Sequence, residues 1–292
     1  MRSIARRHPF AVFLSIAYGI SAAVFTVPLL SNAGIGVIDI DLPGAAPFIL
    51  LSAVGLAAAA FIATALADGR EGVRELRRRT FRFRVRAAWY AIAVLLLPGT
   101  AFGAALVVAG IDPIVGLATD PAILAGIVVG AVLAFALVNW WEETAWTGFA
   151  LERLQDRMGP IAASVVTTWL QALVHVPLVF VADGVTVGRV SAEQMPFYLV
   201  ALFVLPIPVR MILTWVYNAS GRSLPIAGLY HAGLGVATGA AFLPVLAPGI
   251  APIVAYAGFA VLAGVVLAMT RGRLGLASST SASSLRTEPA AG

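Results

Sequence analysis

The chain contains eight apolar runs, each long enough to cross a lipid bilayer. They cover residues 9–31, 45–67, 87–110, 120–141, 160–182, 195–217, 223–243 and 248–270. A helix needs about 20 predominantly apolar residues to span the hydrocarbon core, whereas the strands of a membrane barrel are shorter and alternate in polarity. The sequence therefore predicts an all-α polytopic membrane protein with about eight transmembrane helices, in a single domain over residues 1–270.

Composition agrees with this fold class and excludes several kinds of site. Of the 292 residues, 60% are hydrophobic and only 11% are charged, whereas soluble domains carry about 25% charged residues. Cysteine is absent, which excludes disulfides, a cysteine nucleophile and a Cys-ligated metal site. The segment 271–292 is rich in Ser, Ala and Thr, and we expect it to be a disordered tail.

The distribution of arginine predicts the orientation in the membrane. All 19 basic residues are arginine, and eight of them lie in the connecting segment 68–86. With eight spans, 17 arginines fall on the side that holds both termini, and only Arg189 falls on the other side. The positive-inside rule then places the N- and C-termini in the cytoplasm. The first run is longer than the apolar core of a cleaved signal peptide, so we interpret it as an uncleaved signal anchor.

The expected partners and location follow from the same pattern. The arginine cluster lacks the interleaved readout residues of a nucleic-acid surface, so we predict contact with membrane lipids and no nucleic-acid binding. An alanine-rich chain without lysine is typical of a GC-rich prokaryote. The predicted location is therefore the plasma membrane, as a multi-pass protein of a prokaryotic inner membrane. No feature of the sequence indicates an oligomeric state.

Five ionisable residues lie within or directly beside the predicted spans: Glu142, Glu143, His175, Arg210 and His231. Charged groups inside a bilayer are costly and mark functional sites. Taken singly, each has an ordinary explanation: the end of a helix for the acids, an interhelical hydrogen bond for a histidine, or snorkelling to the interface for the arginine. Their number in one chain favours a functional interpretation.

Helical spacing places three of these groups at similar depth. The pair 159–160, Gly-Pro, breaks the helix; Glu142 lies 17 residues before this break and His175 lies 15 residues after it. At about 1.5 Å per residue, the two levels differ by only about 3 Å. His231 lies roughly 14 Å from the turn at 221–222 on the same side. A carboxylate and two imidazoles are therefore predicted to meet in the cytoplasmic half of the membrane.

These residue types suit the hydrolysis of a peptide bond. A Glu–His pair can deprotonate water as a general base. Alternatively, a divalent metal ion such as zinc, held by Glu142, His175 and His231, would lower the pKa of its bound water. The second histidine could instead donate to a developing oxyanion. The Gly-x-Ser-x-Gly elbow of serine hydrolases does not occur in the sequence.

Four segments carry a resemblance to a known family. They read EETAWTGFAL at 142–151, QALVHVPL at 171–178, TWVYN at 214–218 and HAGLG at 231–235. Over about residues 130–240 the chain resembles the CPBP family of intramembrane metalloproteases, also called the CAAX protease and bacteriocin-processing or Abi family. The resemblance implies an endopeptidase for peptide or lipidated-protein substrates. It assigns water activation to Glu142 and His175, a supporting role to Glu143 and oxyanion stabilisation to His231.

Three positions depart from the commonest family pattern. Thr147 stands where the family usually has arginine, Gln171 replaces an aromatic residue, and Gly235 replaces an asparagine that would donate to the oxyanion. We predict that Arg210 reaches Glu143 and supplies the cation that position 147 lacks.

Two other functions fit the same residues. The first is a catalytically degenerate relative that acts as a membrane interaction or immunity protein, which the changes at Thr147 and Gly235 favour. The second is a small-molecule transporter, because buried glutamate and histidine side chains also serve as proton relays.

Overall fold

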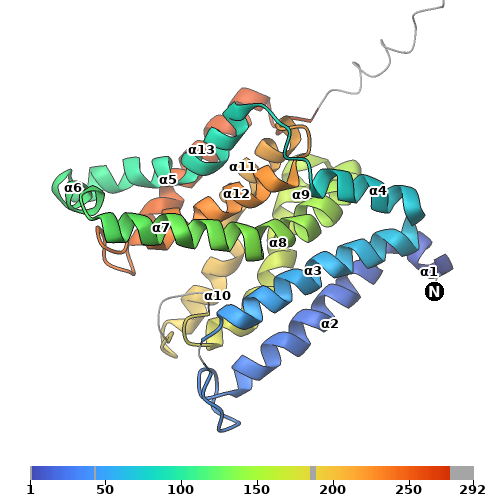
Figure 1. The fold of residues 1–292 in the computed structure, drawn as a ribbon, viewed down its shortest axis with the longest axis horizontal. Coiled ribbons are helices and arrows are strands. Elements are labelled where there is room, and N and C mark those ends of the chain that lie inside the picture. Colours follow the sequence, from blue (N-terminus) through green and yellow to red (C-terminus); the bar gives the residue numbers. More distant parts are fainter. Residues whose placement is uncertain (1, 43, 185–188, 277–292) are drawn as a thin grey trace, which may run out of the picture.

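The part of the chain described in the computed structural model, residues 2–42, 44–184 and 189–276, contains helices and no β-strand. In order, the elements are α1 (Arg2–Arg7), α2 (Pro9–Leu30), α3 (Ala46–Ala67), α4 (Gly69–Thr80), α5 (Ala87–Ala109), α6 (Asp112–Ala118), α7 (Pro121–Ala134), η1 (Phe135–Asn139), α8 (Trp140–Ala145), η2 (Trp146–Leu151), α9 (Glu152–His175), η3 (Val176–Phe180), α10 (Met195–Val204), α11 (Pro206–Ala219), α12 (Leu224–Gly235), η4 (Val236–Ala240) and α13 (Ala251–Thr270). The elements η1, η2 and η4 are π-helical turns, and η3 is a 3₁₀-helix. Figure 1 shows their arrangement.

Six helical stretches in the described residues are long and apolar enough to cross a membrane. Five of them each correspond to one predicted run. Examples are Pro9–Leu30 with 9–31, Ala87–Ala109 with 87–110 and Met195–Ala219 with 195–217. The stretch Pro121–Phe180 is 60 residues long and contains two predicted runs. The all-α polytopic membrane fold is therefore confirmed, while the count of eight passes and the cytoplasmic termini stay predictions. The predicted disordered tail falls mostly on 277–292, outside the described residues.

A break in the 60-residue stretch confirms the predicted reversal at Gly159. Its φ of 76° and ψ of 170° interrupt the helix, and Pro160 begins the next helical segment. Glycine tolerates this left-handed region without the steric cost that a Cβ would bring. Pro160 cannot donate to the preceding turn. The two segments on either side therefore run in different directions, which returns α9 to the level of α8.

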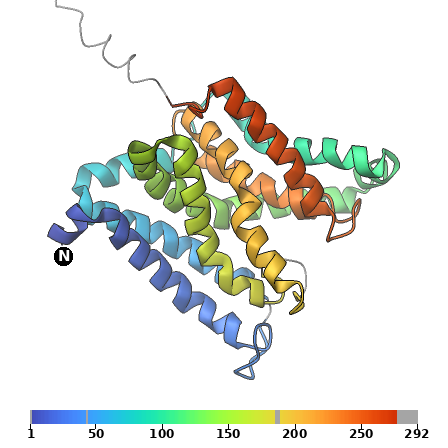
Figure 2. The same cartoon turned by 180° about the vertical axis from the view of Figure 1, so that it is seen from behind.

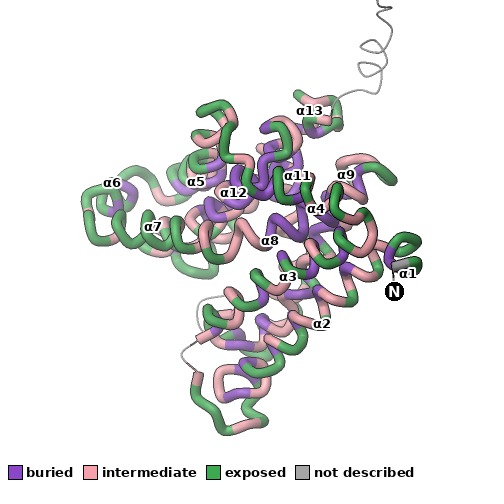
Figure 3. Tube along the Cα trace, turned by 45° about the vertical axis from the view of Figure 1, so that its right-hand side comes forward, coloured by how far each residue is buried: buried purple, intermediate pink, exposed green. Residues whose placement is uncertain are grey.

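The helices pack around α8, α11 and α12. Helix α12 contacts α5, α8 and α11, and α2 packs along α3 on the opposite side of α8. Figures 1 and 2 show the α2–α3 pair on one side of the molecule, and α5, α6 and α7 on the other. Figure 3 shows that the buried residues are concentrated in the central helices. Candidate functional residues therefore lie at the centre of the bundle.

The outer helical surfaces are apolar. Helix α7 has no buried residue, and Val107 and Val261 are 87% and 71% exposed. Water would penalise such surfaces, whereas lipid chains solvate them without cost. This pattern agrees with a multi-pass membrane protein.

The arginine-rich connection forms a helix, α4, that was expected only as a connecting segment. One side packs inward through Leu76, which is buried. Arg79 lies on the same side, where its Nη1 donates to the Tyr217 hydroxyl and lies 3.1 Å from Glu152 Oε2. The opposite side exposes Arg70, Arg74, Arg77 and Arg78. An amphipathic basic helix of this kind suits a position on the membrane surface.

Candidate active site

The two adjacent glutamates lie on α8, between two π-helical turns. Both are buried: Glu142 is 5% exposed and Glu143 is fully enclosed. The π-turns η1 and η2 flank them directly. Each π-turn inserts an extra residue into the helix, and such insertions occur mostly at functional sites. Together they orient α8 differently from a continuous α-helix, and neither was predictable from hydrophobic periodicity.

Glu143 is held by a charged and hydrogen-bonded cluster. Arg210 Nη1 lies 2.7 Å from Glu143 Oε2, and Arg210 Nη2 lies 3.1 Å from Oε1. The Thr147 hydroxyl donates to the same carboxylate and accepts from Arg210 Nη1 at 3.0 Å. The predicted contact between Arg210 and Glu143 is therefore present. Thr147, which carries no charge, nonetheless completes the cluster through its hydroxyl.

Glu142 lies between the two histidines. Its Oε1 is 3.9 Å from His175 Nε2, and its Oε2 is 3.9 Å from His231 Nδ1. These separations exceed a direct hydrogen bond. Gln171 Nε2 donates to Oε2 from 3.3 Å. Lone pairs of Glu142 therefore remain free to accept a proton from a group placed among these three side chains.

The backbone of α9 orients His175. The ring Nδ1 lies 2.9 Å from the carbonyl oxygen of Gln171. Because a carbonyl oxygen only accepts hydrogen bonds, Nδ1 carries the proton. In the neutral ring the acceptor is then Nε2, the nitrogen that faces Glu142. A backbone partner of this kind commonly sets the tautomer of a functional histidine.

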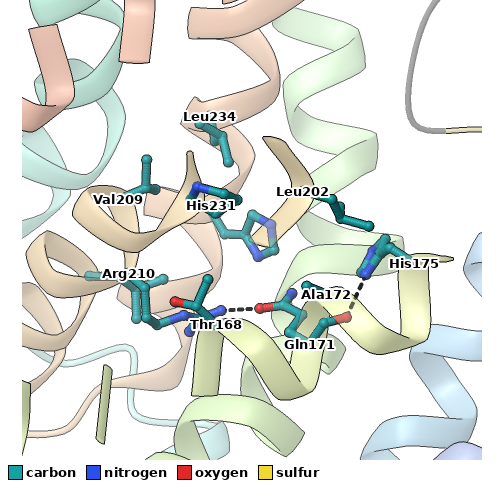
Figure 4. A pocket seen from close by; sticks show the side chains of 11 residues that line it. Thr168, Gln171, Ala172, His175, Leu202, Val209, Arg210, His231 and Leu234 are labelled. Carbon is teal, nitrogen blue, oxygen red and sulfur yellow. Dashed lines mark hydrogen bonds between the residues drawn. The ribbon is translucent and has the colours of Figure 1, made fainter. Parts of the chain in front are cut away.

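Gln171 joins the two halves of the site. Its amide nitrogen donates to Glu142, while its amide oxygen accepts from Arg210 Nη2. Figure 4 shows Gln171 between Arg210 and His175, with dashed lines for the hydrogen bond from Arg210 to the Gln171 side chain and for the one between His175 and the Gln171 carbonyl oxygen. An aromatic residue at this position could not accept and donate in this way. Glutamine at position 171, in place of an aromatic residue, therefore provides the acceptor for the Arg210 guanidinium of α11.

A close backbone contact places His231. A Cβ at Gly228, three residues before His231 on α12, would lie 2.7 Å from the Trp140 Cα, so only glycine permits this approach of α12 to α8. The resulting position puts His231 Nδ1 2.8 Å from Glu143 Oε1. The ring N–H is not aligned as a hydrogen bond there, so the contact is an ion-pair distance rather than a directed bond.

A pocket of about 140 Å³ opens beside these groups, lined by His175, His231, Gln171 and Arg210. Its other walls are largely apolar, with Leu202, Val209, Leu213 and Leu234 among them. Figure 4 shows the polar side chains at one wall and the leucines and Val209 around it. The pocket can therefore take an apolar group next to the two imidazoles.

Gly235 does not contact the cluster. It is exposed on α12, and a Cβ there would meet nothing within 4 Å. Thr238, the nearest hydroxyl along that face, donates to the Leu234 carbonyl oxygen at 2.8 Å. The structure thus offers no side-chain donor from the position where the family commonly has asparagine.

In the described ranges, no three His, Asp or Glu side chains are arranged to hold a metal ion. In the set Glu142, His175 and His231, the nitrogen that His231 turns toward Glu142 is Nδ1, and this atom already lies 2.8 Å from Glu143. The geometry does not fit the zinc ion considered from the sequence, and no step below is routed through a metal.

Comparison with known proteins finds a similarity around these residues. Residues 124–237 match the family model described as "Type II CAAX prenyl endopeptidase Rce1-like". The chain is therefore similar to this family over its central part. It is also 27% identical over 103 residues to "CAAX prenyl protease 2" of Methanococcus maripaludis. The alignment covers 35% of the chain and 37% of that relative. The family match contains all four sequence motifs and every residue of the cluster.

Proposed function

We propose that this chain is an intramembrane endopeptidase of the CAAX protease type, which hydrolyses a peptide bond near the cytoplasmic face of a prokaryotic plasma membrane. The observation that carries the proposal is the position of Glu142, 3.9 Å from each of two histidines on two other helices. The family match and the relative's name support the same class. The positive-inside pattern supports the cytoplasmic face.

In the proposed reaction, Glu142 is the general base. It removes a proton from a water molecule as the water oxygen attacks the carbonyl carbon of the scissile bond. The carbonyl π electrons move to oxygen and form the oxyanion. Glu142 then passes the proton to the amide nitrogen as the C–N bond breaks, which leaves a carboxylic acid and an amine. His175 Nε2 accepts a hydrogen bond from the water and orients it.

His231 and Glu143 complete the proposed machinery. The His231 ring presents Nδ1 to Glu143, so Nε2 is the ring nitrogen left to donate to the oxyanion. A donor fixed before the reaction contributes most in a pocket with few waters. Glu143 orients His231. Arg210 and Thr147 hold the Glu143 carboxylate, which keeps the negative charge of Glu143 away from the reacting carbonyl.

The proposed substrate presents an apolar group beside the scissile bond, because apolar side chains form most of the pocket wall. Candidate substrates are peptides and lipidated proteins. A test panel should therefore pair a prenylated C-terminal peptide with its unmodified counterpart, together with an apolar peptide that carries no lipid.

The testing experiment uses the full chain, purified and reconstituted into lipid nanodiscs, with this panel and mass-spectrometric detection of products. Glu142→Gln keeps the shape of the side chain but cannot accept the proton, so we expect cleavage to fall at least 100-fold. His175→Ala should give a loss of similar size. Glu71→Gln, on the exposed side of α4, is the matched control and should retain full activity.

Cleavage by the wild type that survives in Glu142→Gln would refute the assignment of the base. Absence of cleavage across the panel, with the wild type correctly inserted, would support the degenerate relative. Flux of a small solute into proteoliposomes that depends on Glu142, without cleavage, would support a transporter.

A further inference from the structure

A second polar site lies away from the catalytic pocket, at the ends of two candidate spans. An open pocket of about 710 Å³ is lined by Arg82, Arg84, Arg86, Trp89 and the turn at 219–221. One candidate span begins at Ala87 and another ends at Ala219. The pocket therefore lies where the hydrocarbon region gives way to the headgroup layer.

The three arginines of this pocket have no anionic partner in the part of the chain that the structure describes. Four neighbouring cations, Arg74, Arg78, Arg79 and Arg222, pair with glutamates, whereas Arg70 and Arg77 of α4 are exposed and lie outside the pocket. No carboxylate is among the residues that line the pocket. Three guanidiniums thus share one concave surface without a counter-charge from the described protein.

Two further features of the pocket favour an anion. Arg86 is the N-terminal cap residue of α5, a 23-residue helix that receives no side-chain cap hydrogen bond, and it lines the pocket, so the positive end of the helix dipole lies at this wall. Trp89 follows one turn later and packs edge-on against Trp215, with ring centroids 5.6 Å apart. Tryptophan at the end of a span is typical of the headgroup level of a bilayer.

We infer that this pocket binds the phosphate of an anionic phospholipid headgroup. A guanidinium group can donate two parallel hydrogen bonds to a phosphate. Because the pocket lies at the headgroup level of the membrane, we expect that phosphate to belong to a lipid and not to a solute. Arg82 lies against Gly221 in the turn between α11 and α12, with Nη2 3.0 Å from the position of a Cβ there. The bound headgroup bridges the α4–α5 connection and the α11–α12 turn. This site is separate from the peptidase chemistry and does not depend on it.

The test measures lipid binding to the delipidated full chain in neutral detergent by native mass spectrometry. The probes are dioleoylphosphatidylglycerol, dioleoylphosphatidylcholine and inorganic phosphate. The double variant Arg84→Gln/Arg86→Gln removes two exposed cations of the pocket. The double variant Arg70→Gln/Arg77→Gln removes two exposed cations of α4 outside it. Both change the net charge equally.

We expect phosphatidylglycerol to bind at least 10-fold more tightly than phosphatidylcholine. At about 1 kcal/mol per arginine near the surface, the pocket variant should raise the dissociation constant for phosphatidylglycerol about 30-fold. The control should change it less than 3-fold. An equal loss of phosphatidylglycerol affinity in the two variants would show that binding depends on net charge and not on this pocket, and would overturn the proposal. Binding of inorganic phosphate as tight as that of phosphatidylglycerol would overturn the lipid assignment in favour of a solute phosphate site.

Discussion

The ion pair between Arg210 and Glu143 joins α11 to α8 in the middle of the bundle, and its removal gives a sharp test. Arg210→Met keeps much of the side-chain length and removes the charge. Glu143 is fully enclosed and Arg210 is 6% exposed, so the remaining carboxylate cannot recover its hydration. Breaking one partner of a buried pair costs about 3–5 kcal/mol. Because Thr147 still donates to Glu143, we expect a loss near the lower end, about 3 kcal/mol.

An exposed pair sets the scale for this loss. Arg74 lies 2.7 Å from Glu71, the same separation as in the buried pair, but the two side chains are 67% and 81% exposed. Exposed pairs of this kind contribute about 0–1 kcal/mol. Arg74→Met should therefore lower the free energy of unfolding by less than about 1 kcal/mol. The comparison separates burial from the loss of an arginine as such.

A double variant moves the cation that pairs with Glu143 from position 210 to position 147. Thr147 contacts Glu143 from four residues along the chain, so an arginine there can pair with it. Arg210→Ala removes the original cation and leaves space for the new one. The double variant Thr147→Arg/Arg210→Ala should recover at least half of the stability that Arg210→Ala loses, and should recover cleavage in parallel.

The assay is equilibrium unfolding in mixed micelles, followed by tryptophan fluorescence, with peptide cleavage measured on the same samples. A change of less than 1 kcal/mol for Arg210→Met, equal to that of Arg74→Met, would refute the reasoning that the buried carboxylate depends on this cation. If the double variant Thr147→Arg/Arg210→Ala were no more stable than Arg210→Ala, an arginine at position 147 could not replace Arg210.

Three further results are expected. Gly235→Asn should raise kcat about 10-fold, because the position opens to free space and an oxyanion donor contributes a few kcal/mol at most; an unchanged or lower kcat, measured with the best peptide, would contradict this. Gly228→Ala should destabilise the fold by about 1–3 kcal/mol, since its Cβ would meet the Trp140 backbone, whereas Gly126→Ala on α7 meets nothing within 4 Å and should be neutral. Incubation with a zinc chelator should leave kcat within twofold of the untreated enzyme, and a loss that added zinc restores would show that a metal takes part.

The spans and the break in the chain were predictable because they depend on short-range sequence properties. Apolar runs located the long helices to within a few residues, and Gly159 with Pro160 marked the break by their restricted backbone chemistry. The pairing of Arg210 with Glu143 was predicted from the family resemblance, because Thr147 stands where an arginine is usual and a buried carboxylate needs a cation.

Other features depend on tertiary contacts and could not be predicted in this way. The segment 68–86 has the composition of a polar linker, but part of it forms α4, where Leu76 is buried and Arg79 contacts Glu152 on α9 and Tyr217 on α11. The double role of Gln171 depends on the rotamers of Arg210 and Glu142, which no periodicity specifies. The contact at Gly228 likewise involves a residue 88 positions away, Trp140.

The two π-turns around α8 each hold an extra residue without shifting the helices that flank them. Each turn accommodates one residue more than an α-helix would. Because the wider turn takes up that residue locally, deletion of a single residue within 135–139 would relax the turn to an ordinary α-helix and leave α7 nearly in phase with Glu142 and Glu143. A residue deleted from the regular α-helix of α7 would instead rotate the part before it by about 100°. The segment 135–139 should therefore accept the loss of one residue more readily than α7 itself.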